Sequence, residues 1–278
     1  MKIINKNKVE SFLERMNFKE TIFVLDFDWT ITTTWDWGSF SPINRGKNAP
    51  IDFMKALGEY YYPIEKASKF SEIKDSLEGL DFILADSWIS FEDFRHIMMS
   101  RRWNTTMMIA VKYHLDIDNF SVEEWEFREW MEWFLHYLSD NSRDYLIVSA
   151  WIKNYIKNFF IHHWFRIDRM HIVGNEFMTD NQWKAIGYDK NLITPFTKQH
   201  LDYREHNIWK KQFAIQFWDS LWDARIINDH FEGKNVLSIW ITSWDESRYE
   251  SFCELFDIVL ETKEEGINEV LKLLKIKI

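Results

Sequence analysis

Four aspartates stand in two closely spaced pairs, and these residues could do chemistry if the fold brings the pairs together. Asp26 and Asp28 lie in the segment LDFDWT, and Asp219 and Asp223 lie four residues apart in FWDSLWDAR. Carboxylate oxygens are hard ligands of the kind that Mg²⁺ prefers, and carboxylates packed together repel one another unless a cation lies between them. We therefore expect the two pairs to surround a divalent cation.

The segments around these residues predict buried strands that alternate with helices. Short apolar runs rich in β-branched residues predict strands at 21–27, 144–150, 212–217, 235–240 and 257–260. Helical patterns lie between or after these runs, at 152–163, 221–229, 246–254 and 264–274. This alternation is typical of an α/β fold, in which a doubly wound parallel sheet is covered by helices on both faces.

The candidate residues lie at the carboxyl ends of the predicted strands, the edge where such sheets bind ligands. Asp26 and Asp28 end the first strand. Ser149 ends the second, Asp219 follows a later strand, and Lys198 lies in the connection before that later strand. The order predicts a single site that combines carboxylates, a hydroxyl and an ammonium group.

Residues 34–141 separate the first two predicted strands and carry mostly helical patterns. The stretch ends in SVEEWEFREWMEWFLHYL, where Ser121 and Glu124 form a plausible capping box for a helix. This length is too great for one crossover, so we interpret 34–141 as an inserted α-helical cap domain. Residues 1–33 and 142–278 then form the catalytic core domain.

The candidate residues lie in four motifs, DFDWT, VSAW, the lysine of TPFTKQ, and WDSLWDA. In this order they resemble the motifs of the haloacid dehalogenase superfamily. One D-x-D-x-T motif alone would be weak, because paired aspartates also occur in turns. The resemblance implies a Rossmann-like fold and phosphoryl transfer, in which Asp26 forms an aspartyl-phosphate and Asp28 protonates the leaving hydroxyl.

The same resemblance implies roles for the other candidates. Lys198 would supply positive charge, while Ser149 and the backbone following it, from Ala150 on, would bind phosphate oxygens. Mg²⁺ is the implied cofactor, with waters and phosphate completing its shell. The residues implied to hold or support the metal are Asp26, Asp28 through its backbone carbonyl, Asp219, and Asp223 as a supporting residue.

A narrower resemblance, to the cytosolic pyrimidine 5′-nucleotidases, covers nearly the whole chain. The segment EYYYPIE is similar to that family's nucleotide-contacting segment and implies that Glu65 recognises the base, with Asp86 or Ser87 as a further candidate. The implied substrate is a pyrimidine nucleoside 5′-monophosphate. EYYYPIE could instead be an aromatic helix end that packs the cap on the core. Another small phosphomonoester such as phosphoserine, or a catalytically impaired scaffold, is the alternative function.

Composition and charge narrow the class of partner. The formal charge of −10 and the pI near 5.4 argue against a nucleic-acid polymer, because phosphate binding along a polymer needs a surplus of Lys and Arg. Cys253 is the single cysteine, and no signal-peptide pattern or membrane-spanning run is visible. We expect a cytoplasmic protein, monomeric or weakly homo-oligomeric, that acts on a small molecule and does not bind membranes.

The chain has 16 tryptophans and only 8 glycines. In SAW and WDSLWDA, tryptophan stands where the resembled family has glycine, which implies that some codons are UGA, read as glycine in the source and rendered here as tryptophan. A naturally tryptophan-rich homologue with a damaged active site is the alternative. The positions concerned are Trp29, Trp88, Trp130, Trp151, Trp164, Trp183, Trp218, Trp222 and Trp240.

Overall fold

A computed structural model gives the structure of the chain. Contacts divide it into two compact units, which we name the core unit (Met1–Trp37, Val122–Gly174 and Pro195–Ile278) and the second unit (Gly38–Ser121 and Asn175–Thr194). The residues that the structure describes are 1–27, 30–33, 107–108, 110–112, 114–117, 126–128, 130–167, 170–189, 191–193, 197–198, 201, 210–219, 223, 226–227, 231, 235–241, 249–260 and 265–275.

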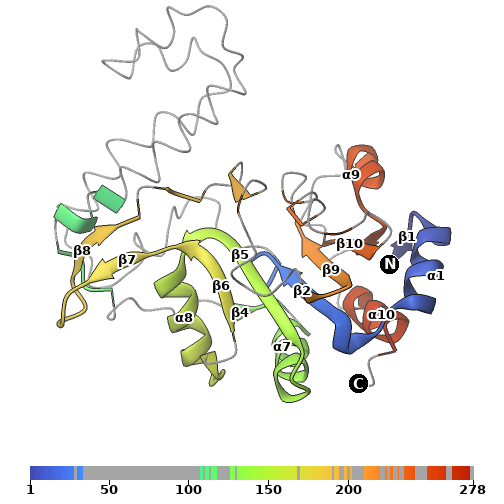
Figure 1. Cartoon of the computed structure of the whole chain (residues 1–278), viewed down its shortest axis with the longest axis horizontal. Coiled ribbons are helices and arrows are strands. Elements are labelled where there is room, and N and C mark those ends of the chain that lie inside the picture. The colour runs from blue at the N-terminus through green and yellow to red at the C-terminus, as the bar shows by residue number, and fades with distance from the viewer. Residues whose placement is uncertain are drawn as a thin grey trace, which may run out of the picture. The chain divides into compact units, whose positions relative to one another are not determined.

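A seven-stranded sheet with strand order β1-β11-β10-β9-β2-β5-β6 forms the centre of the fold (Figure 1). Strand β2 pairs in parallel with both β5 and β9, and β9, β10 and β11 continue the parallel pairing, while β1 adds an antiparallel edge. The predicted α/β sheet is therefore confirmed. Its strands are β1 (Lys2–Ile3), β2 (Thr21–Leu25), β5 (Asp144–Ile152), β6 (His171–Asn175), β9 (Phe213–Trp218), β10 (Val236–Ile241) and β11 (Ile258–Leu260).

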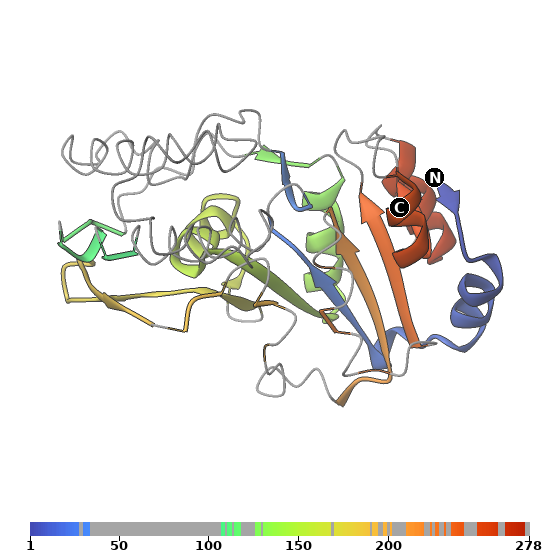
Figure 2. The same cartoon turned by 90° about the horizontal axis from the view of Figure 1, so that it is seen from above.

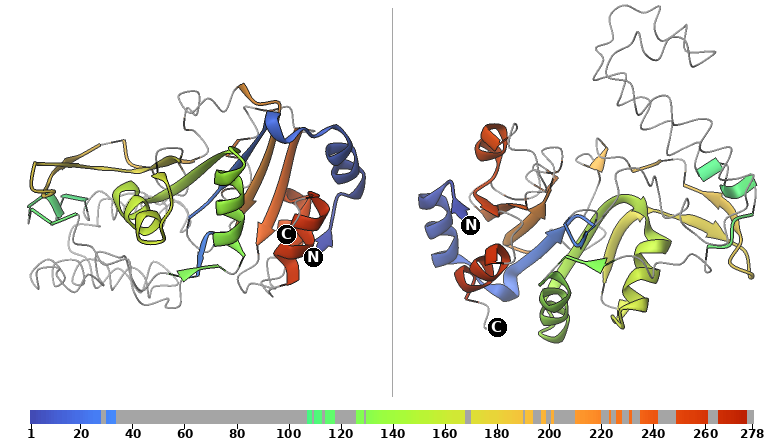
Figure 3. Two further views of the ribbon diagram at one scale, coloured as in Figure 1. Left: turned by 90° about the horizontal axis from the view of Figure 1, so that it is seen from below. Right: turned by 180° about the vertical axis from the view of Figure 1, so that it is seen from behind.

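Hydrophobic side chains cover both faces of this sheet, which is why its strands read as continuous apolar runs rather than alternating ones. Successive side chains of a strand point to opposite faces. In β2, Phe23 and Leu25 belong to one buried cluster, and Ile22 and Val24 belong to another. Figures 2 and 3 show β2, β9 and β10 running side by side.

Helices lie against both clusters, as a doubly wound sheet requires. The cluster that contains Phe23 also contains side chains of α1, α7, α8 and α10, whereas α9 contributes Phe252 to the opposite cluster. Figure 1 shows α9 on the other side of the sheet from α7, α8 and α10. No helix in the described ranges is long and apolar enough to cross a membrane. The helices are α1 (Lys6–Arg15), α7 (Met131–Asp140), α8 (Lys153–His162), α9 (Tyr249–Leu255) and α10 (Glu265–Leu273), with a 3₁₀ turn at Phe18–Glu20.

The helix predicted to start near Ser121 starts later in the structure. Glu126–Phe127 forms β4, which pairs antiparallel with β3 (Thr32–Thr33), and α7 begins at Met131. The extended pairing of β4 with β3 overrides the helical pattern of this stretch, because two-strand hydrogen bonds satisfy the same backbone groups. Both residues of the predicted capping box lie outside the described ranges.

The division into units differs from the predicted domain boundaries. Helix α7, placed by the sequence at the end of the inserted domain, packs Phe134 and Leu138 in the core cluster and belongs to the core unit, which resumes at Val122. The second unit also includes the hairpin of β7 (Phe177–Thr179) and β8 (Ala185–Tyr188). Most of the proposed cap, including 34–106, lies outside the described residues.

Candidate active site

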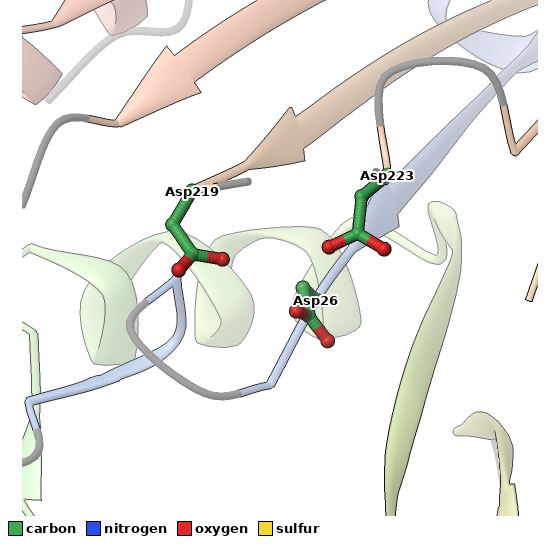
Figure 4. A group of neighbouring side chains, drawn as sticks. All are labelled: Asp26, Asp219 and Asp223. Atoms are coloured by element: carbon green, nitrogen blue, oxygen red, sulfur yellow. The ribbon is translucent and has the colours of Figure 1, made fainter. Parts of the chain in front are cut away.

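Three aspartates from two neighbouring strand ends and one turn converge at the carboxyl edge of the sheet. Asp26 directly follows β2, Asp219 directly follows β9, and Asp223 lies in the turn beyond. Each offers a carboxylate oxygen within 4.8 Å of the others. Figure 4 shows the carboxylates of Asp26, Asp219 and Asp223 lying beside one another. The parallel register that pairs Leu25 with Phe217 brings the first two together, because each aspartate comes just after its strand.

Lys198 joins this cluster from the connection before β9. Its Nζ lies 2.9 Å from Oδ1 of Asp26 and 3.3 Å from Oδ1 of Asp223. Lys198, Asp26 and Asp223 are all buried. Buried charges persist only when they are paired, because a lone one would lose its hydration without compensation. The lysine is therefore a structural counter-charge to two carboxylates as well as a candidate for binding an anion.

Hydrogen bonds orient the carboxylate of Asp26. Its Oδ1 accepts from the backbone N–H of Phe27 at 2.8 Å and from Nζ of Lys198 at 2.9 Å. Two donors on one oxygen fix the plane of the carboxylate and leave its second oxygen in a defined direction. A carboxylate held in this way is preorganised for attack on a substrate.

The surroundings of Asp219 disfavour its ionised form. Burial raises its pKa well above the ordinary value of an aspartate, and the charges of Asp26 and Asp223 raise it further, while Lys198 opposes these effects. Thr30 donates a long hydrogen bond of 3.4 Å from Oγ1 to its Oδ1. Three carboxylates lie close to one ammonium group, so their negative charge exceeds the positive charge of that group. Carboxylate oxygens are suitable ligands for a hard divalent cation such as Mg²⁺, which would supply the missing positive charge.

Ser149 and Ala150 lie on β5, the strand beside Asp26. The parallel pairing of β2 with β5 sets Leu25 opposite Ile147, so Ser149 lies two residues beyond this pair toward the carboxyl edge. Ser149 and Ala150 are both buried. The Oγ of Ser149 accepts the backbone N–H of Trp151 at 3.0 Å. A hydroxyl that accepts one hydrogen bond still has its own proton to donate to an anion.

The structure thus brings together Asp26, Lys198, Asp219 and Asp223, and places Ser149 and Ala150 on the adjacent strand. Asp28, the predicted general acid, lies outside the described residues. Glu65, Asp86 and Ser87, the candidates for recognition of the base, also lie outside them. Their roles stay predictions from the sequence.

Arg128 is a charged residue of this region that the sequence analysis missed. Its backbone N–H donates to the carbonyl of Ile31 at 2.8 Å, which ties it to the chain that follows Asp26. The Arg128 side chain is buried; burial lowers the pKa of the guanidinium, and the negative charge of Asp219 opposes this shift. No spacing in the sequence indicates this, because the proximity arises from the pairing of β3 with β4, which are two residues each.

No protein-family model matches the chain, and a search of curated protein sequences finds no match. Among solved structures, cytosolic 5′-nucleotidase IIIB bound to cytidine matches with a TM-score of 0.65 at 16% identity, over 97% of this chain and 89% of that one. The chain has the haloacid dehalogenase fold.

Two phosphoserine phosphatase structures share the haloacid dehalogenase fold with the chain. A substrate-bound complex matches with a TM-score of 0.51 at 12% identity, covering 94% of this chain and 100% of that one. A phospho-aspartyl intermediate analogue matches with a TM-score of 0.50 at 13% identity, covering 93% of this chain and 100% of that one. The fold predicted from the four motifs is confirmed.

Proposed function

We propose that the chain is a Mg²⁺-dependent phosphomonoesterase that hydrolyses pyrimidine nucleoside 5′-monophosphates through an aspartyl-phosphate on Asp26. The observation that carries this proposal is the cluster of Asp26, Lys198, Asp219 and Asp223 at the carboxyl edge of the sheet, in which all but the partly exposed Asp219 are buried. A fold shared with a 5′-nucleotidase over nearly the whole chain supports the nucleotide as substrate.

Each of these residues has a separate role in the proposed phosphoryl transfer. The oriented carboxylate of Asp26 attacks phosphorus, so that the bond to the leaving oxygen breaks and an acyl-phosphate forms. Lys198 lies within hydrogen-bond distance of Asp26 and can place its positive charge against phosphoryl oxygens. Asp28 protonates the leaving hydroxyl and then removes a proton from the water that hydrolyses the acyl-phosphate; this role rests on the resemblance.

Mg²⁺ would be held by Asp26, Asp219 and the backbone carbonyl of Asp28, with Asp223 orienting a water or Lys198. When bound, the ion supplies positive charge that offsets the clustered carboxylates and polarises the phosphoryl group. The raised pKa of Asp219 supports this assignment, since burial and the charges of Asp26 and Asp223 disfavour its carboxylate, and a divalent cation would offset both effects.

Release of inorganic phosphate from a panel of monoesters tests the proposed activity. We expect release from UMP and CMP that depends on Mg²⁺ and stops with EDTA, and lower release from phosphoserine. The assay should include the chain as printed and a version with Trp151→Gly, Trp218→Gly and Trp222→Gly. Highest release from phosphoserine would shift the proposal to that substrate, which two structural matches favour. No release from either version would favour a scaffold.

Binding of Mg²⁺ can be measured without turnover. We expect Mg²⁺ to raise the midpoint of thermal unfolding, since a ligand present at about 100-fold its Kd stabilises the folded state by ~2.7 kcal/mol. Asp219→Asn should remove most of this rise. Asp257→Asn is the control, because Asp257 is a buried aspartate that pairs with Lys8 away from the cluster. An undiminished rise in Asp219→Asn would contradict the assigned ligand.

A further inference from the structure

Three tryptophans have backbone conformations that glycine adopts far more easily. Six described residues other than glycine have φ in the left-handed region, and three of these are tryptophan. A side chain in this region crowds its own backbone, and a bulky one does so at real cost. By contrast, Gly174 and Gly187 both have ordinary φ angles. The six are His114, Trp130, Ser142, Trp164, Trp183 and Lys275.

Trp164 occupies the glycine position of a complete Schellman motif. Helix α8 ends at the C-cap residue His163, and Trp164 follows with φ of 63°. Its N–H donates to Ile161 at 3.0 Å, and the N–H of Phe165 donates to Phe160 at 2.9 Å, which are the two hydrogen bonds that define this motif. The side chains of Phe160 and Phe165 also make the hydrophobic contact that often accompanies this motif, with their ring centroids 5.2 Å apart. Trp164 itself is 90% exposed, so packing does not explain an indole there.

Trp183 occupies the corresponding position of a tight hairpin turn between β7 and β8. Its N–H donates to the carbonyl of Asp180 at 3.1 Å, and the N–H of Asp180 donates to Lys184 at 3.0 Å. The Oδ1 of Asp180 also accepts from Gln182 and Lys184. These bonds describe a three-residue loop whose last residue is left-handed, the place where such turns use glycine. Trp183 has φ of 58° there and is 55% exposed.

Trp130 lies in the turn that precedes α7, with φ of 66° and ψ of −17°. The N–H of Met131 donates to the carbonyl of Arg128 at 2.9 Å and closes the turn. Trp130 is the third residue of this turn. A positive φ with ψ near zero at the third residue is typical of a type II turn, and glycine is the residue that such a position favours. The indole N–H of Trp130 is buried and has no hydrogen-bond partner in the described part of the chain.

We propose that Trp130, Trp164 and Trp183 are glycine in the protein that the source cell makes. Their codons would be UGA, read as glycine in that cell and rendered as tryptophan here. Three unrelated local structures, a helix end, a hairpin and a turn before a helix, each demand a left-handed residue at a tryptophan. A chain with 16 tryptophans and 8 glycines has the composition that such a substitution would produce. The backbone makes no such demand at Trp151, Trp218 or Trp240, whose φ angles are ordinary.

The coding sequence gives a direct test that is independent of enzymatic activity. We expect UGA at the codons for residues 130, 164 and 183, and peptides from the source cells whose masses contain glycine at these positions. A UGG codon at any of the three, or a peptide that contains tryptophan there, overturns the inference. Neither result depends on whether the chain is a phosphatase.

Thermal unfolding of the chain expressed with ordinary tryptophan codons gives a second test. We expect Trp164→Gly and Trp183→Gly each to raise the unfolding midpoint by about 2 °C or more, because glycine relieves the left-handed conformation. Trp164→Ala and Trp183→Ala are matched controls that remove the indole but keep the Cβ, and they should rise less. Trp133→Gly, inside α7, should lower the midpoint, since glycine weakens a helix interior. Equal effects of alanine and glycine, or no rise with glycine, overturn the inference.

Discussion

Replacing Asp26 with asparagine should lower kcat for the preferred monoester at least about 10³-fold while the chain stays folded. An amide has nearly the shape of the carboxylate but cannot form an acyl-phosphate. Its oxygen can still accept the N–H of Phe27, and Lys198 keeps its pairing with Asp223 at 3.3 Å. Steady-state phosphate release and far-UV circular dichroism of Asp26→Asn together measure both parts of the expectation.

Asp257→Asn is a closely matched control for this variant. Asp257 is buried like Asp26, and Oδ2 accepts from Nζ of Lys8 at 2.8 Å and from the backbone N–H of Ser238 at 3.0 Å. Both aspartates therefore bind one lysine and one backbone amide, but Asp257 lies outside the carboxylate cluster. We expect Asp257→Asn to lower stability and leave kcat within about threefold. Turnover retained in Asp26→Asn, or lost equally in both variants, would remove Asp26 from the role of nucleophile.

The central sheet could be predicted because its strands are buried on both faces. The runs at 21–27 and 144–150, for example, became β2 and β5, whose side chains enter both hydrophobic clusters. The edge strand Lys2–Ile3 could not be predicted, because it is two residues long, exposed, and formed only by pairing with β11. The local sequence pattern predicts a strand where its residues are fully buried. It does not predict a strand that forms only by pairing with a segment distant in the sequence.

The same difference applies to the candidate site. Asp26 and Asp219 were predictable because each directly follows a strand, and the parallel register then sets their separation. Arg128 was not, since its approach to Asp219 depends on β3 and β4 pairing across residues distant in sequence. The start of α7 was missed for a related reason. A left-handed residue precedes it, and the printed tryptophan at 130 hides the signal that a glycine would have given.

Of the substitutions proposed, Lys198→Met should have the largest effect on stability, lowering the free energy of unfolding by about 3–5 kcal/mol. Lys198 is almost fully buried and neutralises Asp26 and Asp223, so its removal leaves like charges facing one another without compensation. Turnover should fall as well, because the same ammonium group would contact the phosphoryl oxygens. Urea unfolding without metal measures the loss. As a control, Lys184→Met removes a more exposed pair with Asp116 at 3.6 Å and should cost no more than ~1 kcal/mol.

The effect of Mg²⁺ on the stability of lysine variants distinguishes Lys198, which lies at the proposed cation site, from Lys8, which does not. Added Mg²⁺ should restore much of the stability lost in Lys198→Met, because a divalent cation among three carboxylates supplies the charge that the lysine provided. Lys8→Met removes the ammonium partner of Asp257, where no second or third carboxylate is grouped with it among the described residues, so Mg²⁺ should not restore its stability. Equal recovery in the two variants, or none in Lys198→Met, would mean that the cluster does not select a divalent cation.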